Sequence, residues 1–212
     1  MQTLELLRAA ALNCQNCPLA ARRTNVVFGE GNPNSPLVLV GEGPGDQEDK
    51  SGRPFVGRAG QLLDKALADN GLDRSKVYIC NTVKCRAADW STGRPVNRPP
   101  TIEETAACRV WLLPQLSFLK PKVILCIGAP SARNLIKPNF KITAERGKYF
   151  PCEYARTAIA TLHPAYILRQ QNMQKDDGGY SCLVADIHKA WDAAVRLAEK
   201  DALSGVETTP DL

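Results

Sequence analysis

Four short apolar runs, rich in β-branched residues and separated by stretches with helical periodicity, constrain the fold of this chain most strongly. Each run is apolar throughout rather than alternating with polar residues, which is typical of a strand buried on both faces of a sheet. Strands that alternate with helices predict a parallel sheet with right-handed crossovers and helices on both faces. We therefore expect an α/β fold of three layers, α/β/α, around a central four-stranded parallel sheet. The four runs are residues 36–40, 76–80, 122–127 and 156–162.

The stretches between the runs carry signals for helix starts and ends. Apolar side chains share one face of residues 60–71, and Gly71 suits the left-handed position that follows a helix end. Thr101 and Glu104 have the spacing of a capping box, which predicts a helix start at Thr101. We expect two further helices, over residues 130–136 and 184–203. Residues 87–100 are expected to form one long loop rich in proline and glycine.

Length and composition fit one domain. The chain has 212 residues, and a domain commonly takes roughly 100–200 residues. We therefore expect one domain over residues 1–203 and a flexible tail over residues 204–212. No stretch approaches the roughly 18–20 uninterrupted apolar residues of a membrane span, and the N-terminus lacks the basic opening of a secretory signal. We expect a cytoplasmic monomer that binds no membrane, and its net charge of +5 favours an anionic partner only weakly.

Small or polar residues follow every predicted strand. The first strand leads into the glycine-rich residues 41–45, and the others lead into Asn81, Gly128 and His163. Ligands of open parallel sheets bind beyond the carboxyl ends of the strands, so these residues are candidates for one site. Each residue taken alone is more often a turn, a cap or a structural histidine. Their common location favours function.

Phe55 lies in the segment GRPFVG and has two readings. It is either a core anchor beneath a loop or a flat surface on which a planar ligand stacks. The neighbouring glycines favour stacking, because they let the backbone approach a ligand closely. The preceding GEGPG segment lacks the Lys-Ser/Thr of a P-loop and does not have the spacing of the dinucleotide fingerprint.

The chain contains eight cysteines. In a reducing compartment this number favours metal ligands, a catalytic thiol or buried packing over disulfides. Cys14 and Cys17 are separated by two residues, as in a typical ligand pair. Four thiolates would suit either a tetrahedral zinc ion or a four-iron four-sulfur (4Fe-4S) cluster, and spacing alone favours neither.

The motifs together resemble a known family. The string GEGPGDQEDKSGRPFVGRAGQLLDKAL is followed by YICNTVKCR, PTIEETAACRVWL, PKVILCIGAPSA and TLHPAYILR. These segments resemble the iron–sulfur uracil-DNA glycosylases of bacteria and archaea, called family four, and the resemblance extends from Cys14 to about Trp191. It implies the fold of that family and hydrolysis of the N-glycosidic bond of uracil in base excision repair. The resemblance also implies that the product is an abasic site, formed without a lyase step and without a divalent metal. The implied substrate is single- or double-stranded DNA that contains uracil, and the implied location is the prokaryotic cytosol.

The resemblance assigns roles to the residues at the strand ends. Phe55 would stack on a uracil flipped out of the DNA, and Asn81 would accept from uracil N3–H and donate to O4, a pattern that cytosine does not match. His163 would donate to uracil O2 as a neutral group. Glu42 would position or deprotonate the attacking water, although this carboxylate also has a simpler reading as a group that orients a loop. Gly43 and Glu48 are further candidates for the uracil site. Either Glu48 or the region of Gly45 would exclude thymine sterically.

The resemblance also suggests groups that bind the cofactor and the DNA. Cys85 and Cys108 would join Cys14 and Cys17 as ligands of a structural 4Fe-4S cluster, with zinc as the alternative; the other cysteines, Cys80, Cys126, Cys152 and Cys182, would pack in the protein. An apolar wedge would fill the gap left by the flipped base, and arginine and lysine would bind phosphate, unless these residues simply begin a helix or line a surface. The wedge candidates are Tyr166, Ile167 and Leu168, and the phosphate candidates are Arg169, Arg53, Arg58 and Lys84.

Two features depart from the family pattern. Gly43 stands where many members carry alanine, and the loop over residues 86–97 is longer than expected. A related class of proteins carries in this region a histidine that becomes crosslinked to DNA, but residues 86–97 contain no histidine. A non-catalytic or DNA-crosslinking nucleic-acid-binding protein remains the alternative function, and a small redox protein would need neither Asn81 nor His163.

Overall fold

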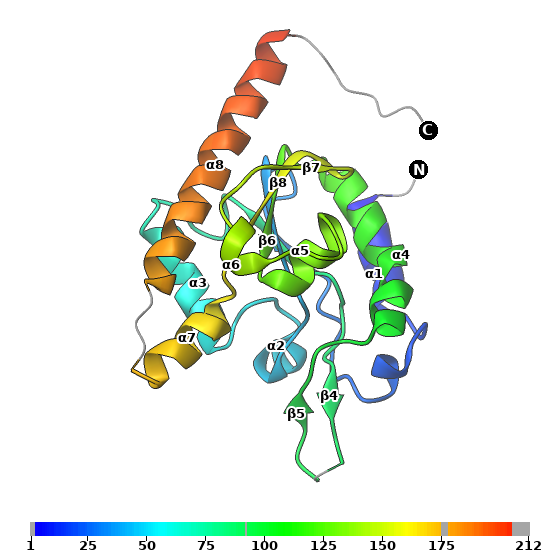
Figure 1. The fold of residues 1–212 in the computed structure, drawn as a ribbon. Coiled ribbons are helices and arrows are strands. Elements are labelled where there is room, and N and C mark those ends of the chain that lie inside the picture. The colour runs from blue at the N-terminus through cyan, green and yellow to red at the C-terminus, as the bar shows by residue number, and fades with distance from the viewer. Residues whose placement is uncertain (1–2, 92, 175–177, 205–212) are drawn as a thin grey trace.

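A mixed β-sheet lies between two layers of helices (Figure 1). The computed structural model describes residues 3–91, 93–174 and 178–204. The strands are β1 Glu30–Gly31, β2 Leu37–Gly41, β3 Tyr78–Asn81, β4 Ala88–Asp89, β5 Val96–Asn97, β6 Val123–Ile127, β7 Phe150–Cys152 and β8 Ala155–Thr161. The α-helices are α1 Leu4–Leu12, α2 Asp46–Ser51, α3 Arg58–Ala68, α4 Ile102–Leu119, α5 Ala129–Leu135, α6 Ile142–Glu145, α7 Pro164–Asn172 and α8 Gly179–Ser204, with a 3₁₀ turn, η1, at Pro18–Ala21.

The sheet contains the predicted parallel strands and two additional edge strands. Its order is β1-β3-β2-β6-β8-β7, in which β3, β2, β6 and β8 are parallel and β1 and β7 pair antiparallel at the edges. The expectation of a purely parallel, four-stranded sheet is therefore correct for the centre and incomplete at both edges. The two edge strands are too short to produce a hydrophobic period in the sequence.

Each face of the sheet carries its own apolar core, which confirms the three layers. Side chains of α3, α7 and α8 cover one face, where Leu63 and Leu183 are fully buried. Side chains of α4 and α5 cover the other face, where Leu112 and Leu116 are fully buried. Figure 1 shows α3, α7 and α8 on one side of the sheet and α1 and α4 on the opposite side.

The helix signals of the sequence are present in the structure. At the start of α4, Thr101 Oγ1 accepts from Glu104 N at 3.1 Å and Glu104 Oε2 accepts from Thr101 N at 2.8 Å, which confirms the capping box. Gly71 adopts the predicted left-handed conformation, with φ of 67°. Helix α8 starts at Gly179, earlier than expected, and continues to Ser204. The remainder of the expected tail, residues 205–212, lies outside the described residues.

The long loop expected over residues 87–100 contains a small antiparallel hairpin. Its strands β4 and β5 pair Ala88 with Asn97 and Asp89 with Val96. In Figure 1 this β4–β5 hairpin projects from the end of the molecule where α2 and α7 lie. Arg86 ties its base to α2, because its guanidinium contacts Asp46 Oδ1 and Asn97 Oδ1, each at 2.7 Å. Among the described helices, none combines the length and the apolar character needed to cross a membrane.

Candidate functional site

Residues from the ends of neighbouring strands meet at one edge of the sheet. Gly41 at the end of β2 lies opposite Asn81 at the end of β3, and Gly128 N donates to Thr161 O at 2.9 Å, next to His163. The ring centroids of Phe55 and His163 are 6.0 Å apart. We call Gly41, Glu42, Phe55, Asn81 and His163 the strand-end cluster.

The absence of a side chain at Gly41 allows this cluster to assemble. A Cβ atom at residue 41 would lie 2.4 Å from both Asn81 Oδ1 and Phe55 Cζ, which is far inside van der Waals contact. Any larger residue would therefore push the amide or the ring away. The first glycine of GEGPG thus serves close approach, which explains why a glycine follows the buried strand directly.

Asn81 has a buried oxygen without a partner. Its side chain is 2% exposed, and Oδ1 accepts no hydrogen bond from the described residues. An unpaired buried acceptor costs about 1–3 kcal/mol. Because this oxygen lies beside Gly41 and Phe55, the cluster holds an acceptor that a ligand with an N–H group would satisfy.

Phe55 has the first of the two roles considered from the sequence, whereas stacking on a ligand stays a prediction. It is 6% exposed and belongs to the core beside α3, so it serves as an anchor, yet its ring also approaches Gly41 and His163. Its φ of 53° lies in the left-handed region, which is uncommon for a residue with a bulky side chain. The surroundings must therefore hold this conformation.

Glu48 lies on α2, between the loops that frame the strand-end cluster. Its Oε1 accepts from Val56 N and Gly57 N, each at 2.8 Å, while Oε2 accepts from Gly45 N at 3.0 Å. This carboxylate therefore joins the GEGPG loop to the segment that carries Phe55. At Gly43, the family's alanine would place Cβ 2.7 Å from Val83 Cγ2, so the glycine accommodates the present position of Val83.

His163 is held as a neutral hydrogen-bond donor. It caps the N-terminus of α7, where Nδ1 accepts from Ala165 N at 3.1 Å. Burial and, to a smaller extent, repulsion from Arg169 lower the pKa of His163 to about 4, and attraction to Glu48 opposes this shift. Since Nδ1 acts as an acceptor, the proton of the neutral ring sits on Nε2.

Glu42 follows Gly41 directly and is half-buried. Burial raises the pKa of its carboxyl group. A carboxylate with a raised pKa is a better proton acceptor than a carboxylate with the ordinary pKa. This property suits a group that positions or deprotonates a water molecule. Its backbone oxygen accepts from Val83 N at 3.1 Å, which fixes the chain where it leaves the sheet.

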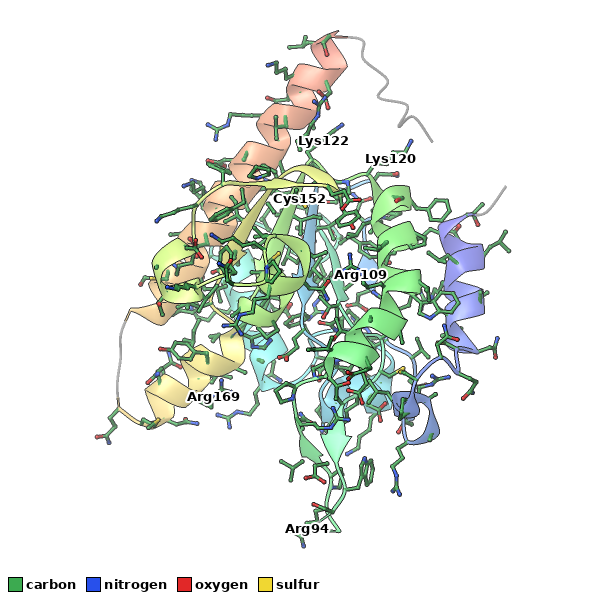
Figure 2. The ribbon with its side chains drawn as sticks, turned by 45° about the vertical axis from the view of Figure 1, so that its right-hand side comes forward. Arg94, Arg109, Lys120, Lys122, Cys152 and Arg169 are labelled. Carbon is green, nitrogen blue, oxygen red and sulfur yellow. The ribbon has the colours of Figure 1, made fainter. Side chains whose placement is uncertain are left out.

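Helix α7 presents the candidates for contact with a nucleic acid. Tyr166 and Leu168 are half-buried and Arg169 is exposed, but Ile167 is 2% exposed within the core. The expectation of a wedge at Ile167 is therefore wrong, since every third or fourth residue of this helix faces the core. Figure 2 shows Arg169 on α7 and Arg94 on the β4–β5 hairpin at the same end of the molecule, with Lys122 at the opposite end.

Three residues predicted to bind phosphate differ in their exposure and in their partners. Lys84 is 1% exposed, so the expectation that it binds phosphate is wrong; its Nζ donates to Asn81 O at 2.9 Å and to Gln115 Oε1 at 2.6 Å. Arg53 is engaged by Glu30, with Nε and Oε2 2.7 Å apart. Arg58 is exposed at the start of α3.

The four cysteines assigned by resemblance line one cavity. Cys14 and Cys17 come from the segment after α1, Cys85 follows β3, and Cys108 lies on α4. Four N–H groups point at sulfur. Trp111 Nε1 and Asn16 N are 3.0 and 3.5 Å from Cys14 Sγ, Lys84 N is 3.2 Å from Cys108 Sγ, and Arg23 Nη1 is 3.5 Å from Cys85 Sγ. Such donors stabilise negatively charged sulfur. The remaining cysteines lie elsewhere, Cys80 and Cys126 fully buried and Cys152 and Cys182 half-buried.

The spacing of these thiols bears on the group they would hold. Four sulfur atoms around one zinc ion, at about 2.3 Å from the metal, would be about 3.8 Å from one another. Within the described part of the chain, no three Cys, His, Asp or Glu side chains are arranged so that they could hold a single metal ion. In a 4Fe-4S cluster each thiolate binds a different iron, so the ligands lie farther apart. Four cysteines around one cavity supply the four thiolates that a 4Fe-4S cluster requires.

Sequence reasoning missed two sets of contacts that support the strand-end cluster. Lys84 and Gln115 form a buried polar pair beneath Asn81, and Arg74 donates to the carbonyl groups of Pro54 and Phe55. Their partners are distant in the chain, so no local spacing identifies them. A lysine and a glutamine within otherwise apolar segments were the available signals, because a polar residue there needs a partner.

Comparison with known proteins adds information independent of this geometry. The family model of the uracil DNA glycosylase superfamily matches residues 28–180. A type-4 uracil-DNA glycosylase of Thermotoga maritima is 44% identical over 172 residues, which cover 81% of this chain and 86% of that protein. A type-4 uracil-DNA glycosylase of Sulfurisphaera tokodaii is 39% identical over 183 residues, which cover 82% of this chain and 80% of that protein.

The fold also resembles a solved structure. The crystal structure of wild-type Pedobacter heparinus SMUG2 aligns with a TM-score of 0.50 over 82% of this chain and 77% of that chain. Sequence identity in this alignment is 14%, so the likeness concerns the fold alone. It agrees with the three layers and the central sheet described above.

Proposed function

This chain belongs to the uracil DNA glycosylase superfamily, and from that membership we propose how its strand-end cluster removes uracil from DNA. The chain is a uracil-DNA glycosylase, a hydrolase of DNA repair. The observation that carries the assignment of the site is the buried, unpaired Oδ1 of Asn81. It lies at the carboxyl edge of the sheet beside Phe55 and near a neutral His163.

Recognition of the base rests on Asn81 and Phe55. Uracil carries a donor at N3 and an acceptor at O4, which match the oxygen and the nitrogen of one side-chain amide. Cytosine reverses both groups, so it would leave the Oδ1 acceptor of Asn81 facing another acceptor. Sites that hydrogen-bond a substrate group reject an analogue lacking it by about 10⁴ or more. Phe55 offers its ring for stacking against the flipped base.

Bond cleavage places positive charge on the sugar and negative charge on the departing uracil. His163 Nε2–H donates to uracil O2 and stabilises the negative charge, and a histidine already neutral near pH 7 needs no deprotonation first. Glu42 orients the water that attacks the sugar, and its raised pKa suits it to accept a proton. Water is the nucleophile, so the product is an abasic site and the enzyme has no lyase step. No divalent metal takes part in these steps.

The cysteine cavity fits a 4Fe-4S cluster. Cys14, Cys17, Cys85 and Cys108 would hold it, and a bound cluster would supply iron–thiolate bonds that crosslink the N-terminal segment to α4. The donors from Trp111 and the backbone of Lys84 would stabilise the thiolates that bind the cluster.

DNA would lie across the end of the molecule that carries α7. Arg169 is exposed there and would bind phosphate. Tyr166 and Leu168 would contact the bases that flank the flipped nucleotide. We propose that a single copy of the chain acts on uracil in single- or double-stranded DNA, in the prokaryotic cytosol.

Release of free uracil from a labelled oligonucleotide, without added divalent metal, tests this function. We expect the wild type to leave an alkali-labile abasic site and His163→Ala to lower the single-turnover rate by about 10²–10³, the loss typical of one such donor. His188→Ala is the matched control, because His188 is the only other histidine and is exposed on α8. DNA binding without uracil release by the wild type would instead establish a non-catalytic protein.

A further inference from the structure

The backbone around Phe55 is held in an unusual conformation from outside the strand-end cluster. Phe55 has φ of 53°, a conformation that a bulky residue does not adopt unless its surroundings impose it. Gly60 permits it, because a Cβ at residue 60 would lie 1.8 Å from Phe55 O. The contacts that impose the conformation are those made by the peptide groups of the Pro54–Phe55 segment.

Arg74 binds both carbonyl groups of this segment. It lies in the turn between α3 and β3, and its side chain is 20% exposed. Nη1 donates to Pro54 O at 2.8 Å, and Nη2 donates to Phe55 O. A guanidinium group can bridge two carbonyls because its N–H groups are fixed in one plane, whereas a lysine ammonium has no such geometry.

Two carboxylates fix the orientation of this guanidinium. Asp64 Oδ1 on α3 is 2.7 Å from Arg74 Nε, and Glu30 Oε1 on β1 is 2.6 Å from Arg74 Nη1. On the other side of the segment, Glu48 Oε1 accepts from Val56 N and Gly57 N. The carbonyls before the bend therefore face a cation, and the amides after it face an anion.

We propose that Arg74 is a positioning residue for uracil excision, which acts by holding Phe55 in the left-handed conformation that turns its ring toward Asn81 and His163. This inference rests on the proposed function of the strand-end cluster. Without the guanidinium, Glu48 alone holds the peptide after Phe55, and the ring shifts from its place beside Gly41. Arg74 itself touches neither the base nor the DNA.

The test is a double-mutant cycle on single-turnover uracil release. We expect Arg74→Gln to lower the rate ten- to a hundredfold, as displacement of a positioned group by about 1 Å does. In a Phe55→Ala background the same change should cost less than about twofold, since the ring it positions is gone. Arg156→Gln is the matched control, because Arg156 pairs with Asp201 near the opposite edge of the sheet.

Other outcomes distinguish this inference from a structural role and from the proposed function. Equal losses in both backgrounds, or no loss in the wild-type background, would overturn it. If Arg74→Gln does not fold, Arg74→Lys tests the same point, because it keeps the charge but not the two carbonyl contacts, and the same background dependence is expected. Failure of the wild type to release uracil would contradict the proposed function itself.

Discussion

At the scale of single residues, the unpaired Oδ1 of Asn81 is expected to favour ligand binding while it lowers the stability of the free protein. The free protein carries a buried acceptor that no group of the described residues satisfies. Natural sites commonly keep such groups at the expense of stability. Under the proposed function, a base completes this hydrogen bond.

Replacement of Asn81 by leucine should separate the effect of this residue on uracil release from its effect on the free energy of unfolding. We expect Asn81→Leu to abolish uracil release while leaving the free energy of unfolding unchanged or raising it by about 1 kcal/mol, because the desolvated acceptor is removed. Uracil release and urea unfolding of the same preparation measure both. A loss of several kcal/mol would show that the side chain is structurally satisfied and that the site was wrongly assigned.

His163 should make stability depend on pH in a defined window. Burial lowers its pKa from 6.5 in the unfolded chain to about 4 in the folded protein, so the unfolded state binds the extra proton between these values. Stability from this residue is complete above about pH 6.5 and is lost as the pH falls toward 4. Urea unfolding at several pH values from 7 to 5 should show a shallower decline for His163→Gln than for the wild type. Parallel declines would contradict a buried neutral histidine.

Glu42 should set the acid limit of the reaction. Burial raises its pKa above the ordinary value of 4.5, whereas His163 titrates at about 4, so Glu42 is the first of the two to gain a proton as the pH falls. We expect single-turnover rates to decline on the acid side with a midpoint above 4.5, and this decline to vanish in Glu42→Gln. The same acid limb in that variant would assign it to another group.

At the scale of elements, the cysteines join segments that are distant in sequence. The segment after α1 contributes Cys14 and Cys17, and α4 contributes Cys108. Independent contacts also hold this region, since Asp49 Oδ1 on α2 accepts from Thr24 N at 2.9 Å and the side chains of α1 pack against Trp111. A bound cluster would therefore stabilise the edge of the fold more than its central sheet.

Loss of one ligand should expose that edge selectively. We expect Cys108→Ala to lose iron and visible absorbance and to lower Tm by on the order of 10 °C. Hydrogen exchange should rise in residues 3–25 and remain slow in β2 and β6. Cys182→Ala, outside the cavity, is the matched control. Zinc in place of iron in the purified protein, or uniform exchange across the sheet, would contradict this account.

The sequence predicted elements whose signal is local and continuous. The central strands follow from uninterrupted apolar runs, and α4 follows from its capping box. Helix α2 was missed because DQEDKS has no apolar face, and the β4–β5 hairpin was missed because it pairs only two residues on each side. The ends of the strands indicated Asn81 and His163, whereas Arg74 acts on Phe55 from 19 residues away and left no pattern.

At the scale of the whole molecule, one buried lysine connects the cysteine cavity with the strand-end cluster. Lys84 N donates to Cys108 Sγ at 3.2 Å, and its Nζ donates to Asn81 O at 2.9 Å. The same Nζ donates to Gln115 Oε1 on α4, which in turn donates through Nε2 to Phe28 O at 3.0 Å. A polar network therefore crosses the layer between β3 and α4 and contacts the backbone of Asn81.

Lys84→Met tests this connection, since methionine fills similar space without donating to Asn81 O. The backbone N–H that faces Cys108 is unchanged, so iron content should stay at the wild-type level. We expect the single-turnover rate of uracil release to fall about tenfold, the equivalent of one lost hydrogen bond of about 1.4 kcal/mol. An unchanged rate would show that Asn81 is positioned by β3 alone. A parallel loss of iron and rate would show that Lys84 supports the cysteine site first and Asn81 only through it.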